Sequence, residues 1–158
     1  MRHRLATFVA EGRQRYGLVR DEGVVDLSAR HPQWLDLRAV IEAGALANVA
    51  EESASLPADF GIADIVYDIP VPQPEKIICV GVNYPDRNAE YKDGSEAPKY
   101  PSLFPRFPRS FVGHDAALTR PAASPQLDYE GEVVLVIGKA GRHIAERDAL
   151  GHVAAVTL

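Results

Sequence analysis

Residues 128–137 read DYEGEVVLVI and decide the fold, because they join a short acidic motif to a run of apolar residues. The run 133–137 is rich in β-branched residues and a glycine ends it, which predicts a buried strand. Side chains alternate between the two faces of a strand, so Glu130 and Glu132 are expected on one face and Gly131 on the other. Two carboxylates at the mouth of an apolar strand repel each other unless a cation lies between them.

The acidic pair leaves two interpretations open. Carboxylate oxygens are hard donors that suit Mg²⁺, Mn²⁺ or Ca²⁺ better than zinc or copper, so Glu130 and Glu132 could hold such an ion. The two side chains could equally line the solvated face of an edge strand, because Glu-x-Glu alone is a weak signal.

Composition excludes several classes of protein. The chain has 158 residues, enough for one domain or for a small domain and part of a larger one, with 46% hydrophobic and 25% charged residues. The net charge of −5 argues against non-specific binding to nucleic acid or to anionic membranes. No apolar run approaches the ~20 residues of a membrane span. Cys79 is the single cysteine, which excludes an intramolecular disulfide and predicts a reducing cytoplasm.

The first 70 residues read as a small β-meander followed by helix. Trp34 is expected to pack the meander onto the helical part. Prolines at every second position of 68–74 predict a stiff connector, so the expected domains are 1–70 and 71–158. The sequence predicts short strands at 5–10, 16–20 and 24–27, with one or two helices within 36–50.

The second half alternates apolar strands with turn-rich segments. Residues 76–82 predict a second buried strand, and 101–113, where arginines and aromatics alternate between prolines, predict a rigid loop around a pocket for an anion. A short helix is expected at 144–151 and an apolar strand at 153–158. The sequence stops inside that strand, so either it is part of a longer protein or a partner chain completes the sheet.

Ordered motifs in this half resemble the fumarylacetoacetate hydrolase family. They are KIICVGVNY at 76–84, Leu-Phe at 103–104, Val-Gly at 112–113, LDYEGE at 127–132 and VIG at 136–138. The resemblance extends over about 74–158 and implies an α+β fold, mainly β. That fold is a mixed β-roll catalytic domain, incomplete here, after a small N-terminal domain. It also implies a homodimer, bound Mg²⁺ or a similar ion (Mn²⁺ or Ca²⁺), and a small 2-oxo acid or β-diketo acid as substrate.

The resemblance assigns roles to individual residues. Glu130 and Glu132 match the two metal carboxylates of the family, and the third ligand is expected just beyond Leu158. Hydrolytic members place a histidine and a glutamate three residues apart, where this chain has Arg87 and Glu90. Because arginine stays charged and cannot accept a proton, that dyad is broken. Arg87 could bind a substrate carboxylate with Glu90 as sole base, or it could be a solvated loop residue.

Two further residues complete the expected site. Arg106 matches a family lysine that holds substrate, and arginine offers a two-pronged fork for a carboxylate. Tyr84 ends the KIICVGVNY motif and is expected to contact substrate, whereas Tyr129 is expected to pack in the core. The expected function is a divalent-metal-dependent C–C bond hydrolase that stabilises an enolate. The alternatives are an isomerase, decarboxylase or dehydratase of the same family, or a non-catalytic scaffold that another chain completes.

Overall fold

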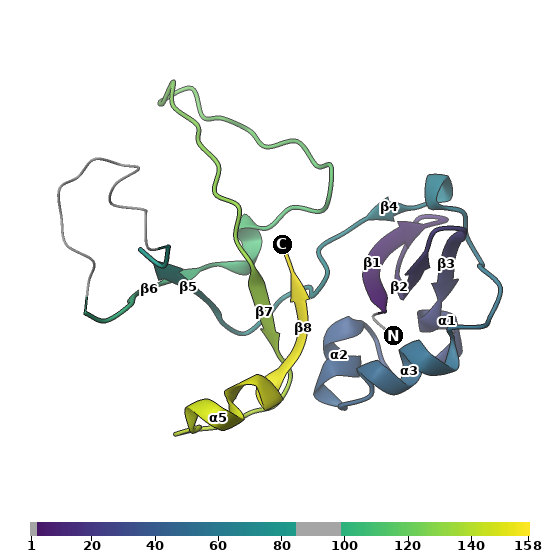
Figure 1. Cartoon of the computed structure of the whole chain (residues 1–158). Coiled ribbons are helices and arrows are strands. Elements are labelled where there is room, and N and C mark those ends of the chain that lie inside the picture. The colour runs from purple at the N-terminus through teal and green to yellow at the C-terminus, as the bar shows by residue number, and fades with distance from the viewer. Residues whose placement is uncertain (1–2, 85–98) are drawn as a thin grey trace. The chain divides into compact units, whose positions relative to one another are not determined.

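A computed structural model describes residues 3–84 and 99–158 (Figure 1). The chain divides into two units. One comprises Met1–Pro72 together with Val112–Leu158, and the other comprises Gln73–Phe111. The fold is mixed α+β with mostly strands.

The N-terminal sheet has four antiparallel strands in the order β3-β2-β1-β4. Glu11 and Gly12 connect β1 to β2 with φ of 52° and 72°, the left-handed geometry of a tight hairpin turn. The three predicted strands are confirmed. The bounds are β1 Arg4–Ala10, β2 Arg13–Arg20, β3 Gly23–Asp26 and β4 Val66–Tyr67.

Three short helices follow the meander: α1 Leu27–Arg30, α2 Leu37–Glu42 and α3 Leu46–Glu52. Asp26 caps α1 by accepting from the Ala29 amide at 3.1 Å, and Asp36 caps α2 through Ala39 at 2.9 Å. The third strand was predicted one residue too far along the chain, at 24–27 instead of Gly23–Asp26, because the Asp26 cap turns the chain into a helix at Leu27. The short 3₁₀ helix η1, Ile62–Asp64, precedes β4.

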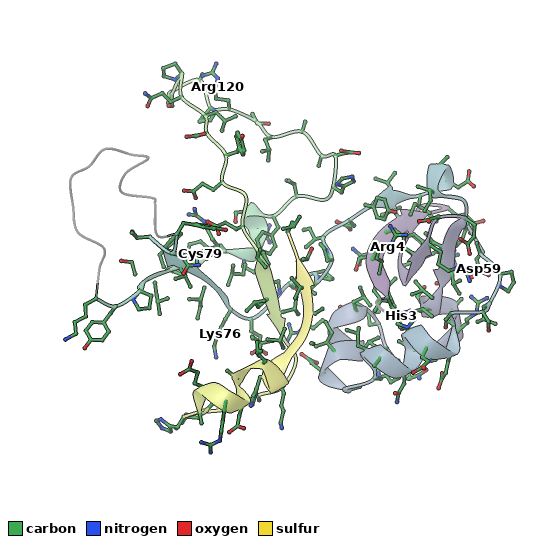
Figure 2. The ribbon with its side chains drawn as sticks, in the orientation of Figure 1. His3, Arg4, Asp59, Lys76, Cys79 and Arg120 are labelled. Atoms are coloured by element: carbon green, nitrogen blue, oxygen red, sulfur yellow. The ribbon has the colours of Figure 1, made fainter. Side chains whose placement is uncertain are left out.

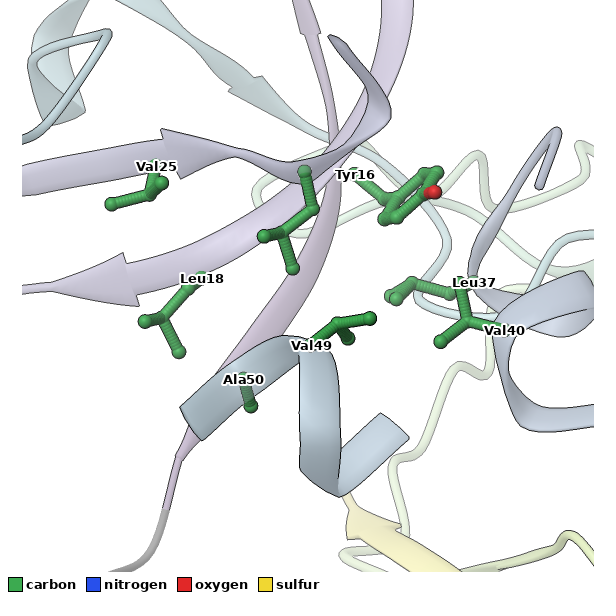
Figure 3. Packing of buried hydrophobic residues seen from close by; sticks show 8 residues of the cluster. Tyr16, Leu18, Val25, Leu37, Val40, Val49 and Ala50 are labelled. Carbon is green, nitrogen blue, oxygen red and sulfur yellow. The ribbon is translucent and has the colours of Figure 1, made fainter. Parts of the chain in front are cut away.

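Most of the buried apolar side chains belong to this N-terminal part (Figure 3). Trp34 packs against the larger core cluster, as predicted. Each fully buried valine, leucine or phenylalanine side chain in these clusters contributes about 1.5–3 kcal/mol to stability. The larger cluster consists of Tyr16, Leu18, Val25, Leu27, Leu37, Val40, Val49 and Ala50, and a smaller one of Phe8, Ala10, Val24 and Ile65.

The remaining strands form two antiparallel pairs. In the first unit, β7 Val134–Ile137 pairs with β8 Val153–Thr157, and α5 Glu146–Ala149 and η3 Leu150–His152 lie between them in the chain. In the second unit, β5 Ile77–Gly81 pairs with β6 Ser102–Arg106, which η2 Pro108–Ser110 follows.

Two expectations for these strands are wrong. Residues 102–106 were predicted as loop, but Pro105 lies opposite Ile78 in a two-stranded sheet, where a strand edge without a hydrogen-bond partner tolerates proline. The strands β5 and β7 were predicted to be buried, yet Ile78, Leu135 and Ile137 are more than half exposed. The described residues provide no layer over those side chains. Among the described helices, none has the length and apolar character needed to cross a bilayer.

Candidate functional site

The two glutamates of the acidic motif lie immediately before β7, in a stretch without helix or strand that spans 112–133. Both side chains are exposed. The prediction that they share one face of a regular strand is therefore not met, because β7 begins only at Val134. The pairing of Val134 with Thr157 explains this start: the same register sets Val133 against Leu158, so residues before Val133 have no partner in β8.

The other predicted residues divide between the second unit and the undescribed part of the chain. Tyr84 and Arg106 belong to the Gln73–Phe111 unit, whereas the two glutamates belong to the first unit. Arg87 and Glu90 lie outside the described residues. Tyr84 is about half exposed, shortly after β5 ends.

Arg106 is the last residue of β6, and its guanidinium lies 4.9 Å from the centre of the Phe104 ring. A cation over an aromatic face at this distance gains a modest electrostatic attraction. The contact orients the guanidinium while the side chain stays exposed, so its N–H groups remain accessible to an anion.

Asp128 is an acidic residue that the sequence argument left out. It lies two positions before Glu130, in the same stretch without helix or strand. Its Oδ1 accepts a hydrogen bond from the Tyr129 amide at 2.8 Å. Tyr129 was predicted to pack in the core, but its side chain is 90% exposed, because no strand among the described residues pairs with this stretch.

The chemistry of the acidic motif suits a hard divalent cation only in part. In the described ranges no three histidine, cysteine, aspartate or glutamate side chains converge as a metal site. Glu130 and Glu132 form no ion pair with any described residue, so both carboxylates are available. Two carboxylates supply fewer than the six oxygens that Mg²⁺ prefers, so the donor set fits this class of ion but leaves room for further ligands.

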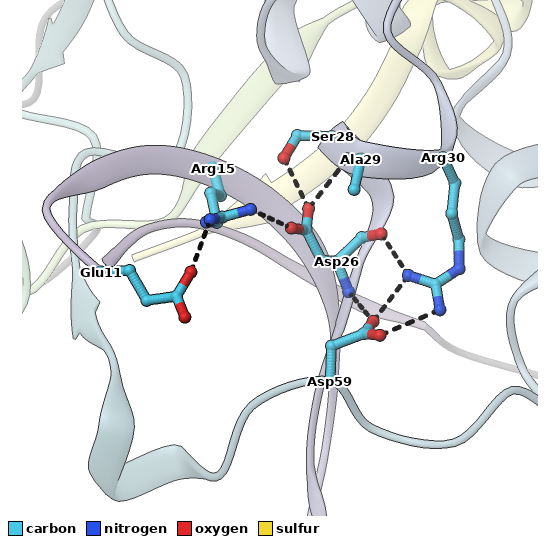
Figure 4. Close-up of polar contacts among 7 residues, drawn as sticks. All are labelled: Glu11, Arg15, Asp26, Ser28, Ala29, Arg30 and Asp59. Carbon is cyan, nitrogen blue, oxygen red and sulfur yellow. Dashed lines mark hydrogen bonds and ion pairs between the residues drawn. The ribbon is translucent and has the colours of Figure 1, made fainter.

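A second polar group lies in the N-terminal sheet and its helix (Figure 4). Asp26 accepts from Arg15 at 2.6 Å, and Arg30 donates to Asp59 at 2.6 Å and 3.1 Å. The hydrogen bond from Arg30 is the main reason why the pKa of Asp59 is lowered. Burial, with smaller effects of Asp26 and Asp36, raises the pKa of Tyr16 to about 12. These carboxylates are satisfied by arginines and by backbone amides, so the group stabilises the fold and offers no reactive side chain.

Comparisons with known proteins identify the family. Residues 76–158 match the family model described as "Fumarylacetoacetate (FAA) hydrolase C-terminal", and the chain belongs to this family. It is 36% identical over 149 residues to a protein from Xenopus laevis named "Oxaloacetate tautomerase fahd2, mitochondrial", covering 91% of this chain and 46% of that protein. It is 37% identical over 101 residues to "Oxaloacetate tautomerase YisK" of Bacillus subtilis, covering 63% of this chain and 34% of that protein.

Solved structures agree with that family. A fumarylacetoacetate hydrolase from Exiguobacterium antarcticum superposes with a TM-score of 0.72 at 29% identity, covering 98% of this chain and 54% of that one. A structure from Mycobacterium smegmatis, described as a putative HpcE protein, gives 0.68 at 27% identity, covering 95% of this chain and 52% of that one. The chain therefore has a fumarylacetoacetate hydrolase-like fold and spans about half the length of these relatives, or less.

Proposed function

We propose that this chain supplies part of the active site of a divalent-metal-dependent enzyme that interconverts the keto and enol forms of a small 2-oxo acid, with oxaloacetate as the first candidate. The observation that carries the proposal is the Glu130-Gly131-Glu132 motif before β7. It lies within the family match of a chain that resembles proteins named oxaloacetate tautomerases.

The proposed metal ligands are Glu130 and Glu132. Their exposed carboxylates are free of competing arginine or lysine partners among the described residues, so binding a cation would break no existing ion pair. A bound Mg²⁺, Mn²⁺ or Ca²⁺ would supply Lewis acidity that lowers the energy of the developing enolate. We expect a third carboxylate beyond Leu158. The β7–β8 register favours this position, because residues following Leu158 would continue opposite Glu132 and Glu130.

The remaining proposed residues handle the substrate carboxylate and the proton. Arg106 binds the carboxylate through its two-pronged guanidinium, and Arg87 adds a second positive charge. Tyr84 offers a phenolic O–H for a further hydrogen bond. Glu90 accepts the proton from the carbon next to the carbonyl and returns it to the carbonyl oxygen. Tautomerisation requires only this internal proton transfer and no attacking water, which suits a chain with Arg87 at the family's histidine position.

C–C bond hydrolysis remains the second candidate. The structural similarity to a fumarylacetoacetate hydrolase, with a TM-score of 0.72, favours this candidate. The chemistry is compatible with either candidate, because both reactions pass through an enolate. A non-catalytic scaffold is the third, favoured by the open apolar faces of β5 and β7. We also propose that the protein forms a homodimer and that it is located in the reducing cytoplasm. The location is proposed because Cys79 is a free thiol.

An absorbance assay of the oxaloacetate enol tests the proposal. The purified protein, extended beyond Leu158 so that it includes the expected third carboxylate, should accelerate decay of the enol with Mg²⁺, and Glu130→Gln should abolish that acceleration because it removes an anionic metal ligand. Glu51→Gln changes an exposed glutamate of α3 and should leave the rate unchanged.

The same preparation separates the alternatives. Release of two products from a β-diketo acid at a higher rate than tautomerisation would favour the hydrolase. The fluorescence of Trp34, packed on the N-terminal core, reports whether that part is folded. A folded protein that includes the expected third carboxylate and accelerates neither reaction would overturn the enzymatic proposal.

A further inference from the structure

The segment 112–116 contacts β4 of the N-terminal sheet at very close range. A Cβ built on Gly113 would lie 2.7 Å from the carbonyl oxygen of Tyr67 and 3.1 Å from the Cα of Asp68. Both neighbours are backbone atoms, which cannot move aside as a flexible side chain can. The requirement for glycine here comes from this close approach of two backbones.

Side chains extend the contact beyond the glycine. The His114 ring meets the Tyr67 ring edge-on, with centroids 5.7 Å apart and planes at 82°, the arrangement that aromatic pairs prefer. The segment then closes into a turn, in which the Ala116 amide donates to the Gly113 carbonyl at 3.2 Å. Asp115 takes a left-handed φ of 61° in this turn, a conformation that aspartate tolerates better than most residues.

The backbone that Gly113 contacts, at Tyr67 and Asp68, is bonded to the N-terminal sheet. Tyr67 pairs with Phe8 in the sheet, and the Asp68 amide donates to the Thr7 carbonyl at 2.9 Å. The Asp68 carboxylate accepts from Gln14 at 2.7 Å, and the buried Thr7 hydroxyl donates to the Pro70 carbonyl at 2.8 Å. These bonds attach Tyr67 and Asp68 to the N-terminal sheet, which packs on its own buried core.

We infer that residues 112–116 form a strap through which the N-terminal sheet positions the segment that carries Glu130 and Glu132. The strap fixes the start of the 112–133 segment on β4, and β7 fixes its end at Val134. Arg120 holds a bend between these points by donating to the carbonyls of Pro121 and Ser124, at the tip of the loop (Figure 2). Gly113 and His114 are thus positioning residues.

The functional part of this inference rests on the proposed metal site. Anchoring both ends of the 112–133 segment reduces the number of conformations available to its carboxylates, so less conformational entropy is lost when they converge on a cation. Loosening the strap should weaken metal binding without touching any ligand.

Hydrogen exchange with and without Mn²⁺ tests the strap in the full chain. Gly113→Ala should accelerate amide exchange at 66–70 and at 112–116 by tenfold or more, and Mn²⁺ affinity should fall several-fold. The matched control is Gly151→Ala, because a Cβ at Gly151 meets nothing within 4 Å. His114→Ala keeps the backbone contact and removes only the ring, so it should accelerate exchange less than Gly113→Ala.

The outcomes separate the strap from the proposed function. Accelerated exchange in Gly113→Ala, with no Mn²⁺ binding even by the wild-type chain, would support the strap as an anchor and contradict the proposed metal site. Exchange at 66–70 and 112–116 that is the same in all three variants and the wild type would overturn the strap. Trp34 fluorescence identifies a variant that has lost its N-terminal fold. If Gly113→Ala is unfolded, amide exchange in His114→Ala tests the strap instead.

Discussion

Arg30 donates two hydrogen bonds to Asp59, from Nη1 to Oδ2 at 2.6 Å and from Nη2 to Oδ1 at 3.1 Å, across 29 residues of chain. The same carboxylate accepts from the Asp26 amide at 2.7 Å, and the Arg30 guanidinium also donates to the Asp26 carbonyl at 2.6 Å. The stretch after α3 is thereby fastened to the end of β3. Two-pronged arginine–carboxylate pairs are among the stronger polar contacts in proteins.

Replacing Asp59 with asparagine should therefore destabilise the N-terminal part. Asparagine keeps one acceptor but loses the charge and one prong of the pair. Because both side chains are about one-third exposed, solvent screening limits the expected loss to about 1 kcal/mol of unfolding free energy. Urea unfolding followed by Trp34 fluorescence measures it, since this is the single tryptophan of the chain.

The contribution of Asp59 should also depend on pH. Its pKa is lowered in the folded protein, chiefly by the hydrogen bond from Arg30, so the stabilisation is complete above the ordinary value of about 4 and is lost as the pH falls through the folded pKa. The difference between wild type and Asp59→Asn should narrow below about pH 4. A constant difference down to acid unfolding would contradict this account.

Tyr16 should titrate at unusually alkaline pH. Its hydroxyl donates to the carbonyls of His31 and Trp34, both at 3.2 Å, and burial is the first cause of the rise in its pKa to about 12. Because the folded pKa exceeds the unfolded value of about 10, the associated stabilisation is present below about pH 10 and is lost as the pH rises toward 12.

The tyrosinate absorbance of wild type and Tyr16→Phe tests this titration. The difference between the two curves isolates one late-titrating group among six tyrosines. The phenylalanine variant should also lose about 1 kcal/mol of stability at neutral pH, because the carbonyls of His31 and Trp34 lose the hydroxyl that donates to them. A difference curve centred near the ordinary tyrosine pKa would contradict the buried position of the hydroxyl.

Two leucines offer a matched pair for the N-terminal core. Leu18 is 2% exposed within the larger cluster, whereas Leu35 is 91% exposed. Leu18→Ala should lower the unfolding free energy by about 2–5 kcal/mol through lost burial and a residual cavity. Leu35→Ala should change it by less than about 0.5 kcal/mol. Equal effects in urea unfolding would mean that this cluster is not the core.

Metal binding provides the remaining prediction. Calorimetric titration with Mn²⁺ in the presence of oxalate, which mimics an enolate of a 2-oxo acid, should give a heat of binding that Glu132→Gln removes. The control is Glu146→Gln, which changes an exposed glutamate in the first turn of α5. Identical heats for the two variants would exclude Glu132 as a ligand.

Local patterns in the sequence predicted the N-terminal elements well. Short strand-like runs separated by turn residues indicated β1 and β2, and an apolar helical face of Leu37, Val40 and Ile41 indicated α2, because these signals depend on neighbours within a few residues. The family match over 76–158 likewise follows from short motifs in a fixed order, which can be read from the sequence without knowing which residues are in contact.

The errors share one cause. Apolar runs around Ile78 and Leu135 read as buried strands, yet burial requires another layer over each face, which the described residues do not provide. The start of β7 depended on its register with β8, so Glu130 could not be assigned to a strand from its own neighbours.

The sequence by itself determined the short strands and helices, the acidic motif and the family, because each is written in residues close together in the chain. Tertiary structure decided that Arg30 meets Asp59, that Gly113 must be glycine beside Tyr67, and that the described residues leave the apolar faces of β5 and β7 uncovered. Those features depend on which distant segments approach one another, and pairing between distant segments leaves no local pattern in the sequence.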